Sequence, residues 1–226
     1  MFKKTIVYAL ISILAGCVGY TLHDSKVDKA LRYKLGISAT ELTPYYYELL
    51  AIQERQDLQV TPGSTIVIGD SITQGLIYPR FVNYGIGSDT TYGVLNRIEK
   101  YKSLKEAKNI ILMIGVNDLK RRSDAEILQN YHKILDRLPS DKLVVFSILP
   151  VNEEMISKNP KMSNTRIKKI NMELADLCNK NSVQFIDLSG YFIDENGYLD
   201  SKYHVGDGIH LNQAGYDIWV KYLDQI

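Results

Sequence analysis

The stretch Thr65-Ile66-Val67-Ile68-Gly69-Asp70-Ser71-Ile72-Thr73 combines an apolar run with a glycine and a lone serine. An apolar run that ends in a glycine and a lone serine is typical of a buried strand followed by a tight turn. Such a turn can present a hydroxyl at the edge of a sheet, where a nucleophile is useful. Serine is also an ordinary turn residue, so Ser71 alone does not indicate an enzyme.

A second feature lies far downstream, in the segment Asp207-Gly208-Ile209-His210. A nucleophilic serine needs a base that removes its proton, and the base needs a carboxylate that orients it. The offset of three residues lets one turn deliver both side chains. The chain therefore supplies a candidate for each of the three roles.

The composition limits the function classes that apply. The chain has 226 residues, of which 45% are hydrophobic and 23% charged, and this is enough for one substantial core. With 27 basic and 26 acidic side chains the net charge is +1, which indicates no nucleic-acid partner. No His, Cys and Asp cluster has the spacing of metal ligands, so we expect neither a metal nor a cofactor.

The N-terminus predicts export. Lys3-Lys4 precede the uncharged stretch Thr5–Leu22, as in a secretory signal. Within it, Leu14-Ala15-Gly16-Cys17 resembles the lipobox of bacterial lipoproteins, which implies lipidation of Cys17. Two alternatives are an uncleaved membrane anchor and an ordinary signal whose removal leaves a soluble protein. All three interpretations place the remainder of the chain in the cell envelope or outside it, and the first two make the membrane a partner.

The remainder divides into a tether with an N-terminal helix over residues 23–60, where Thr43-Pro44 opens the helix, and one domain over residues 61–226. Short apolar runs predict strands at Ser64–Ile68, Phe81–Tyr84, Asn109–Ile114, Lys142–Leu149 and Val183–Ile186. Helical patterns lie at about Thr91–Lys102, Ser123–Leu138, Asn164–Lys180 and Asn212–Leu223. This alternation predicts an α/β fold with a five-stranded parallel sheet that helices cover on both faces.

Further polar motifs follow the predicted strands. The glycine-rich segment Asn83–Thr90 follows the second strand, and Gly115-Val116-Asn117-Asp118 follows the third. Ligands of parallel sheets bind beyond the carboxyl ends of the strands. We therefore expect these motifs to meet Ser71, Asp207 and His210 at one rim.

Taken together, the four blocks resemble those of the SGNH hydrolases, also called GDSL-type esterases and lipases, over about residues 64–215. The resemblance implies a three-layer, flavodoxin-like fold and ester hydrolysis through an acyl-enzyme. It assigns Ser71 as nucleophile, His210 as base and Asp207 as the carboxylate that orients His210. It also implies an oxyanion hole formed by the Ser71 N–H, the Asn117 side-chain amide and one N–H of the glycine-rich loop.

That loop departs from the family pattern, because Ser88 stands where the family usually has glycine. A backbone donor needs no particular side chain, so Ser88 can still supply its N–H. Its Cβ, however, can crowd the acyl pocket or demand a different φ. Gly87, Asp118 and His204 are expected at the substrate rim.

These observations predict an exported serine esterase that removes a small, acetyl-type acyl group from a carbohydrate or lipid of the cell envelope. The same site also suits an acyltransferase, a thioesterase or a lysophospholipase. A binding module that kept the fold and lost catalysis is an alternative of another class. The substrate partner is accordingly a small-molecule, glycan or lipid ester.

Overall fold

A computed structural model describes residues 42–157 and 159–226 of the chain. The export segment predicted for residues 1–22, its lipidation site Cys17 and most of the predicted tether lie outside the described residues. Among the residues that are described, no helix is both long and apolar enough to span a membrane.

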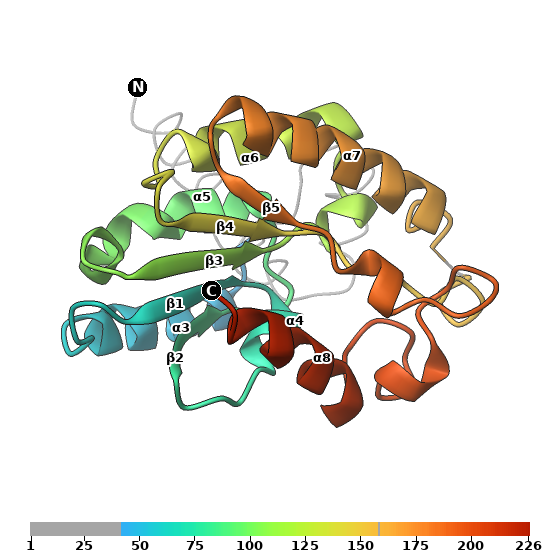
Figure 1. Ribbon diagram of the computed structural model, residues 1–226, viewed down its shortest axis with the longest axis horizontal. Helices are drawn as coiled ribbons and strands as arrows, with labels where there is room; N and C mark the ends of the chain where they lie inside the picture. Colours follow the sequence, from blue (N-terminus) through green and yellow to red (C-terminus); the bar gives the residue numbers. More distant parts are fainter. Residues whose placement is uncertain (1–41, 158) are drawn as a thin grey trace, which may run out of the picture. The chain divides into compact units, whose positions relative to one another are not determined.

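The centre of the fold is a five-stranded parallel sheet with the order β2-β1-β3-β4-β5 (Figure 1). The strands are β1 (Thr65–Gly69), β2 (Phe81–Gly85), β3 (Asn109–Met113), β4 (Leu143–Phe146) and β5 (Gln184–Ile186). The register pairs Gly69 of β1 with Gly85 of β2 and with Met113 of β3. The carboxyl ends of these strands therefore meet at one edge of the sheet, as their sequence pattern predicted.

Six α-helices are described around the sheet. They are α3 (Pro44–Asp57), α4 (Ser71–Gln74), α5 (Thr91–Arg97), α6 (Asp124–Leu135), α7 (Asn164–Lys180) and α8 (Gln213–Leu223). The capping box expected at Ser123 and Glu126 is present at the start of α6. Helix α5 is shorter than predicted, because after Arg97 the chain tightens into a 3-10 turn at Ile98–Lys100.

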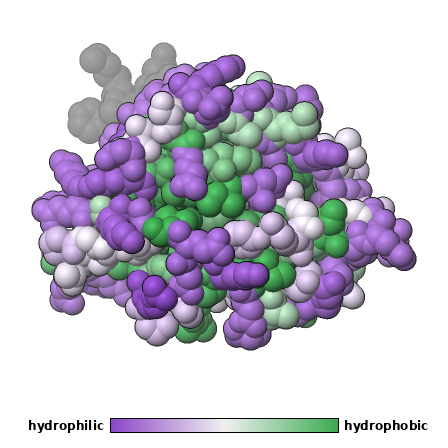
Figure 2. All heavy atoms as spheres, viewed as in Figure 1, coloured by the Kyte–Doolittle hydropathy of each residue, from purple (hydrophilic) through white to green (hydrophobic). Residues whose placement is uncertain are grey.

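The helices form layers on the two faces of the sheet. Helix α6 contacts both α5 and α7, whereas α8 lies in front of the sheet in Figure 1. Trp219 of α8 meets Phe146 of β4 edge-on, with 6.4 Å between the ring centroids. The face seen in Figure 1 is hydrophilic around its margin and has an apolar area near its centre (Figure 2). The fold is the predicted three-layer α/β arrangement.

The N-terminal helix belongs to the compact body of the protein. The chain divides into residues 1–43 and a compact unit Pro44–Ile226, so α3 lies with the sheet and not with the tether. The physical reason is that α3 buries Tyr46, Leu50 and Gln53 almost completely. The compact unit thus includes α3, which was predicted together with the tether.

Candidate active site

The nucleophile turn follows β1 directly. A Cβ atom on Gly69 would lie 2.2 Å from the carbonyl oxygen of Met113, so only glycine fits where β1 ends beside β3. Asp70 caps the short helix α4, because its Oδ1 accepts the N–H of Ile72 at 2.9 Å. Ser71 is the first residue of this helix. These contacts fix the serine at the edge of the sheet.

A chain of hydrogen bonds joins Ser71 to the C-terminal motif. The Oγ atom of Ser71 lies 2.8 Å from Nε2 of His210, across 139 residues of sequence. The other ring nitrogen, Nδ1, lies 2.5 Å from Oδ2 of Asp207. The His210 and Asp207 side chains are 41% and 44% exposed, so this pair is open to solvent. Serine, imidazole and carboxylate have the order and the distances that acyl transfer needs.

Asp207 is held in its ionised form. Burial alone would raise the pKa of this carboxyl, but hydrogen bonds from the His210 side chain and from the backbone of His210 and Ile209 outweigh burial and lower it. Its Oδ1 accepts those two backbone N–H groups at 2.9 and 3.0 Å. The carboxylate can therefore stay charged while it orients the imidazole.

The loop after β2 and the loop after β3 face each other beside this triad. The Asn117 amide donates to the Asp89 carbonyl at 3.1 Å, which fixes the side chain and leaves a second N–H on the same nitrogen. Ser88 is exposed and has a φ of +63°, a left-handed conformation that favours glycine. In the described part of the chain, the backbone N–H groups of Ser71 and Ser88 donate to no protein acceptor. Each of the three groups predicted as oxyanion donors thus keeps an N–H that no described residue accepts.

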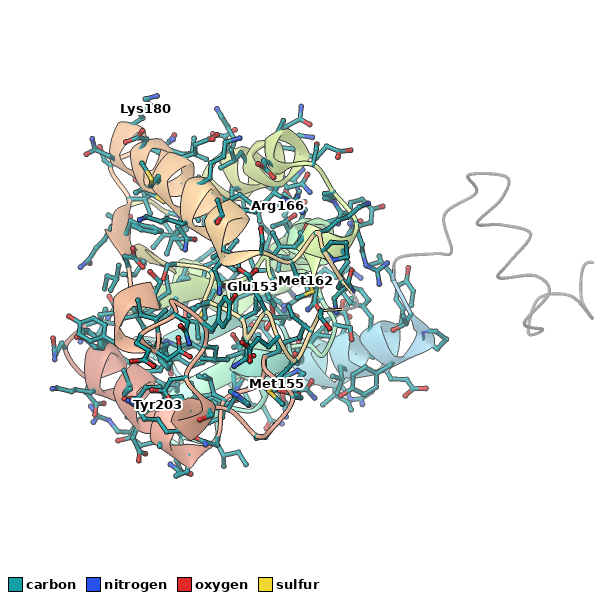
Figure 3. All side chains as sticks on the ribbon, turned by 90° about the vertical axis from the view of Figure 1, so that its right-hand side faces the viewer. Glu153, Met155, Met162, Arg166, Lys180 and Tyr203 are labelled. Carbon is teal, nitrogen blue, oxygen red and sulfur yellow. The ribbon has the colours of Figure 1, made fainter. Side chains whose placement is uncertain are left out.

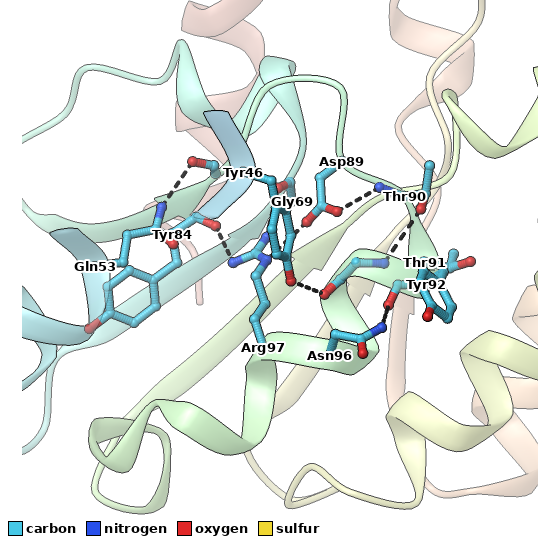
Figure 4. Close-up of polar contacts among 12 residues, drawn as sticks. Tyr46, Gln53, Gly69, Tyr84, Asp89, Thr90, Thr91, Tyr92, Asn96 and Arg97 are labelled. Atoms are coloured by element: carbon cyan, nitrogen blue, oxygen red, sulfur yellow. Dashed lines mark hydrogen bonds and ion pairs between the residues drawn. The ribbon is translucent and has the colours of Figure 1, made fainter. Parts of the chain in front are cut away.

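A buried ion pair supports the glycine-rich loop from beneath. The Arg97 Nε atom lies 2.9 Å from Oδ2 of Asp89, and both side chains are at most 1% exposed. The same guanidinium donates to the carbonyls of Tyr84 and Gly69 at 2.7 and 2.9 Å (Figure 4). One side chain therefore joins the end of β2, the end of β1 and the loop that carries Ser88.

Helix α3 braces the same region. Gln53 donates to the Gly85 carbonyl at 3.0 Å and accepts the Tyr101 hydroxyl at 2.5 Å. Tyr46 donates to the Gly93 carbonyl at 2.7 Å. Burial raises the pKa of Tyr46 well above its ordinary value, so its hydroxyl remains a donor at any physiological pH. The helix therefore holds both the start and the end of the segment that contains Ser88.

Two of the expected rim residues are buried. Asp118 is fully buried and accepts the N–H and the hydroxyl of Thr91 at 2.9 and 2.6 Å, so it joins two loops and does not face a substrate. His204 is 5% exposed and lies beneath the turn that carries Asp207. Gly87 is half-buried, and a Cβ there would come within 3.3 Å of the ring of Tyr45. Of the three expectations, only Gly87 lies where a rim residue could.

Arg97, Gln53 and Tyr101 were not predicted from the sequence as residues of the site. The available signal was weak, because an arginine eight residues after an aspartate is ordinary on an exposed helix. Its burial depends on the register of β1 and β2 and on the position of α3, which are long-range features. No group of three or more His, Cys, Asp or Glu side chains in residues 42–157 and 159–226 could hold a metal ion.

The capping carboxyl gives a test of this geometry. Burial raises the pKa of Asp70 from its ordinary value of 3.8 to about 7. A carboxyl whose pKa is raised by folding destabilises the fold increasingly as the pH rises from about 4 to 7. Asp70→Asn keeps the acceptor for Ile72 and removes the charge. We expect it to raise the free energy of unfolding by on the order of 2–4 kcal/mol at pH 8 and by little at pH 4.

The measurement is denaturant unfolding at both pH values. The exposed Asp141→Asn serves as a matched control, for which we expect almost no change at either pH. An Asp70→Asn gain that is equal at pH 4 and pH 8 would show that Asp70 does not change its charge in this range.

Residues 76–218 match the GDSL-like Lipase/Acylhydrolase family, a range that includes Asn117, Asp207 and His210 and begins just after Ser71. No curated protein sequence matches the chain.

Several solved structures share the fold. A Streptococcus pneumonia protein, provisionally described as a platelet activating factor, has a TM-score of 0.75 at 24% identity, over 89% of this chain and 99% of that one. A GDSL-like lipase from Bacteroides thetaiotaomicron has a TM-score of 0.67 at 19% identity, over 78% and 95%. An acetyl xylan esterase, AlAXEase, has a TM-score of 0.59 at 19% identity, over 71% and 98%. The chain therefore belongs to the GDSL-like lipase/acylhydrolase family, whose members are SGNH ester hydrolases.

Proposed function

We propose that this protein is an exported serine esterase that hydrolyses small, acetyl-type esters through an acyl-enzyme on Ser71. The observation that carries the proposal is the hydrogen-bonded chain from Ser71 through His210 to Asp207, at 2.8 and 2.5 Å. Serine is a weak nucleophile unless a positioned base takes its proton during attack. This chain of residues supplies that base and its orienting carboxylate.

The first half of the reaction forms the acyl-enzyme. The Ser71 oxygen attacks the ester carbon while Nε2 of His210 takes the hydroxyl proton. Asp207 accepts the Nδ1–H of His210 and stabilises the resulting imidazolium. The bond from the ester carbon to the alcohol oxygen then breaks, and His210 returns its proton to the departing alcohol. The acyl group remains as an ester on Ser71.

The second half repeats this sequence with water. His210 removes a proton from the water, whose oxygen attacks the acyl carbon, and Ser71 leaves with the proton. In both halves the carbonyl oxygen gains negative charge beside the N–H groups of Ser71 and Ser88 and the amide of Asn117. Each such donor is typically worth about 3–4 kcal/mol of the barrier.

The exposure of the site favours a large alcohol on the ester. The catalytic His210 and Asp207 are nearly half exposed, so a bulky alcohol can extend into solvent. Similarity of fold to an acetyl xylan esterase agrees with a carbohydrate ester.

A transferase, a thioesterase and a lysophospholipase would use the same residues with another acceptor or acyl group. Product analysis with and without a hydroxyl acceptor separates transfer from hydrolysis, and acyl-chain-length profiling separates the other two. A binding module would leave Ser71 unreactive toward a fluorophosphonate probe.

Ser71 is the residue on which the proposal depends most. Ser71→Ala should lower kcat on acetylated sugars and aryl acetates by about 10⁴-fold or more, because the acyl-enzyme can no longer form. The measurement is an ester panel together with fluorophosphonate labelling. The exposed Ser140→Ala should retain both activity and labelling. Equal activity in Ser71→Ala and the parent protein would refute the proposed nucleophile.

The left-handed backbone at Ser88 gives a test of acyl selectivity. Ser88→Gly should keep acetyl-ester activity and raise kcat/KM on bulkier acyl groups, because it removes a Cβ beside the acyl pocket and keeps the N–H donor. Ser182→Gly is a matched control, since Ser182 also has a positive φ of 56° but follows the C-cap of α7 and belongs to none of the candidate site loops. A loss in Ser88→Gly as large as that in Ser71→Ala would contradict the role of Ser88 as a backbone donor.

The location of the enzyme is part of the proposal and depends on the N-terminal sequence. Lipidation at Cys17 would tether the domain to a membrane of the cell envelope. Cells grown with a labelled fatty acid should incorporate it into the parent protein and not into Cys17→Ser. Labelling that persists in Cys17→Ser, or that is absent from the parent, would favour an uncleaved anchor or a secreted form.

A further inference from the structure

The turn that carries Asp207 and His210 is built around a second histidine. His204 is 5% exposed, and its Nδ1 accepts the backbone N–H of Gly206 at 2.9 Å and that of Gly208 at 3.3 Å. These two glycines flank Asp207 on either side. The ring therefore lies on the inner side of the turn, opposite the side on which Asp207 meets His210.

The conformation of the turn explains why it needs such a support. Gly206 and Gly208 have φ values of +101° and +76°, so the chain reverses through two left-handed residues within three positions. Glycine loses much conformational freedom when it is fixed in a fold, so a turn with two glycines is intrinsically loose. An acceptor shared by both N–H groups offsets this looseness.

The Asp207 side chain also binds the backbone of the turn. Its Oδ1 accepts the next two backbone N–H groups, those of Ile209 and His210. Four hydrogen bonds thus fix the backbone from Gly206 to His210, two to His204 and two to Asp207. Without the two hydrogen bonds to His204, the backbone at Asp207 would no longer be held in place, although the hydrogen bonds of the Asp207 side chain would remain.

His204 itself is anchored by its backbone. It forms an antiparallel bridge with Leu211, and the Asn212 side chain donates to its carbonyl at 3.2 Å. Tyr203 precedes His204 in the chain. The Cβ of Met155 lies 3.1 Å from the position that a Cβ on Gly208 would take. Figure 3 labels both Tyr203 and Met155. The imidazole is therefore held on a rigid support and can act as a template.

The hydrogen bonds also define the protonation of the ring. An Nδ1 that accepts two N–H groups carries no proton, so the proton of the neutral ring is on Nε2. Nε2 is buried, and among the described residues it has no hydrogen-bond partner. A buried donor without a partner is a cost that an apolar residue would avoid. The acceptor at Nδ1 is what the imidazole adds to this position.

We propose that His204 is a positioning residue, whose neutral Nδ1 holds the turn so that Asp207 and His210 reach Ser71. This inference rests on the proposed serine esterase, in which His204 acts only through the turn and touches no substrate. It also changes the role expected from the sequence, which placed His204 at the substrate rim.

Two substitutions of His204 distinguish the effect of its hydrogen-bond acceptor from the effect of the space that its ring fills. In His204→Asn the side-chain oxygen lies near the position of Nδ1 and can accept the same N–H groups, whereas His204→Leu fills the space without an acceptor. We expect His204→Leu to lower kcat by about 10- to 100-fold with little change in KM, because the base and its carboxylate lose their fixed geometry. His204→Asn should stay near the parent. The exposed His132→Leu is the matched control and should be fully active.

A readout that does not depend on esterase activity accompanies these kinetics. Amide hydrogen exchange at Gly206 and Gly208 should be slow in the parent and in His204→Asn, and fast in His204→Leu. Nitrogen-15 NMR of the parent should show His204 with an unprotonated Nδ1, and this applies even if His204→Leu does not fold. A folded His204→Leu with parental kcat, a His204→Asn as impaired as His204→Leu, or a proton on Nδ1 would each overturn the proposal. A parent without activity on any ester would instead refute the proposed function, and the amide and NMR results would still test the hold on the turn.

Discussion

The buried guanidinium of Arg97 is the interaction on which the rest of the site depends. It donates to the carbonyl of Gly69 just before the nucleophile turn, to the carbonyl of Tyr84 at the end of β2, and to Asp89 in the loop that carries Ser88. Neither charge of the buried pair with Asp89 can reach water, so each requires the other. Ser71 and the loop that carries Ser88 follow separate strands, and this side chain fixes their relative position.

The candidate site is formed by two parts of the chain that lie far apart in the sequence. The parallel register brings the ends of β1, β2 and β3 together. Asp207 and His210, in contrast, lie in the long segment between β5 and α8. The two parts meet in the hydrogen bond between Ser71 and His210, and Tyr216 of α8 also donates to the carbonyl of Ile72 at 2.8 Å. The site therefore combines a sheet edge, held by buried charge, with a turn held by backbone hydrogen bonds.

The candidate triad of Ser71, Asp207 and His210 was predictable from the sequence because the types and spacing of these residues are local features. Ser71 follows an apolar run, and Asp207 and His210 lie three residues apart, so neither inference needs the tertiary structure. The burial of Asp118 and His204 was not predictable, since a polar residue beside a motif can face either solvent or the backbone. The sequence also did not show that α3 joins the hydrolase unit, because its three consecutive tyrosines give no clear apolar face. Only the packed structure distinguishes Tyr46, which is buried, from Tyr45 and Tyr47, which are exposed.

We propose that catalysis passes through an ester on Ser71. The decisive experiment is to acid-quench the parent protein during turnover of an aryl acetate and to locate the added acetyl group by peptide mass spectrometry. We expect one acetyl group on the peptide that contains Ser71, and none after the same treatment of Ser71→Ala. Full turnover with the acetyl group on another residue, or with acetyl on the corresponding peptide of Ser71→Ala, would contradict it.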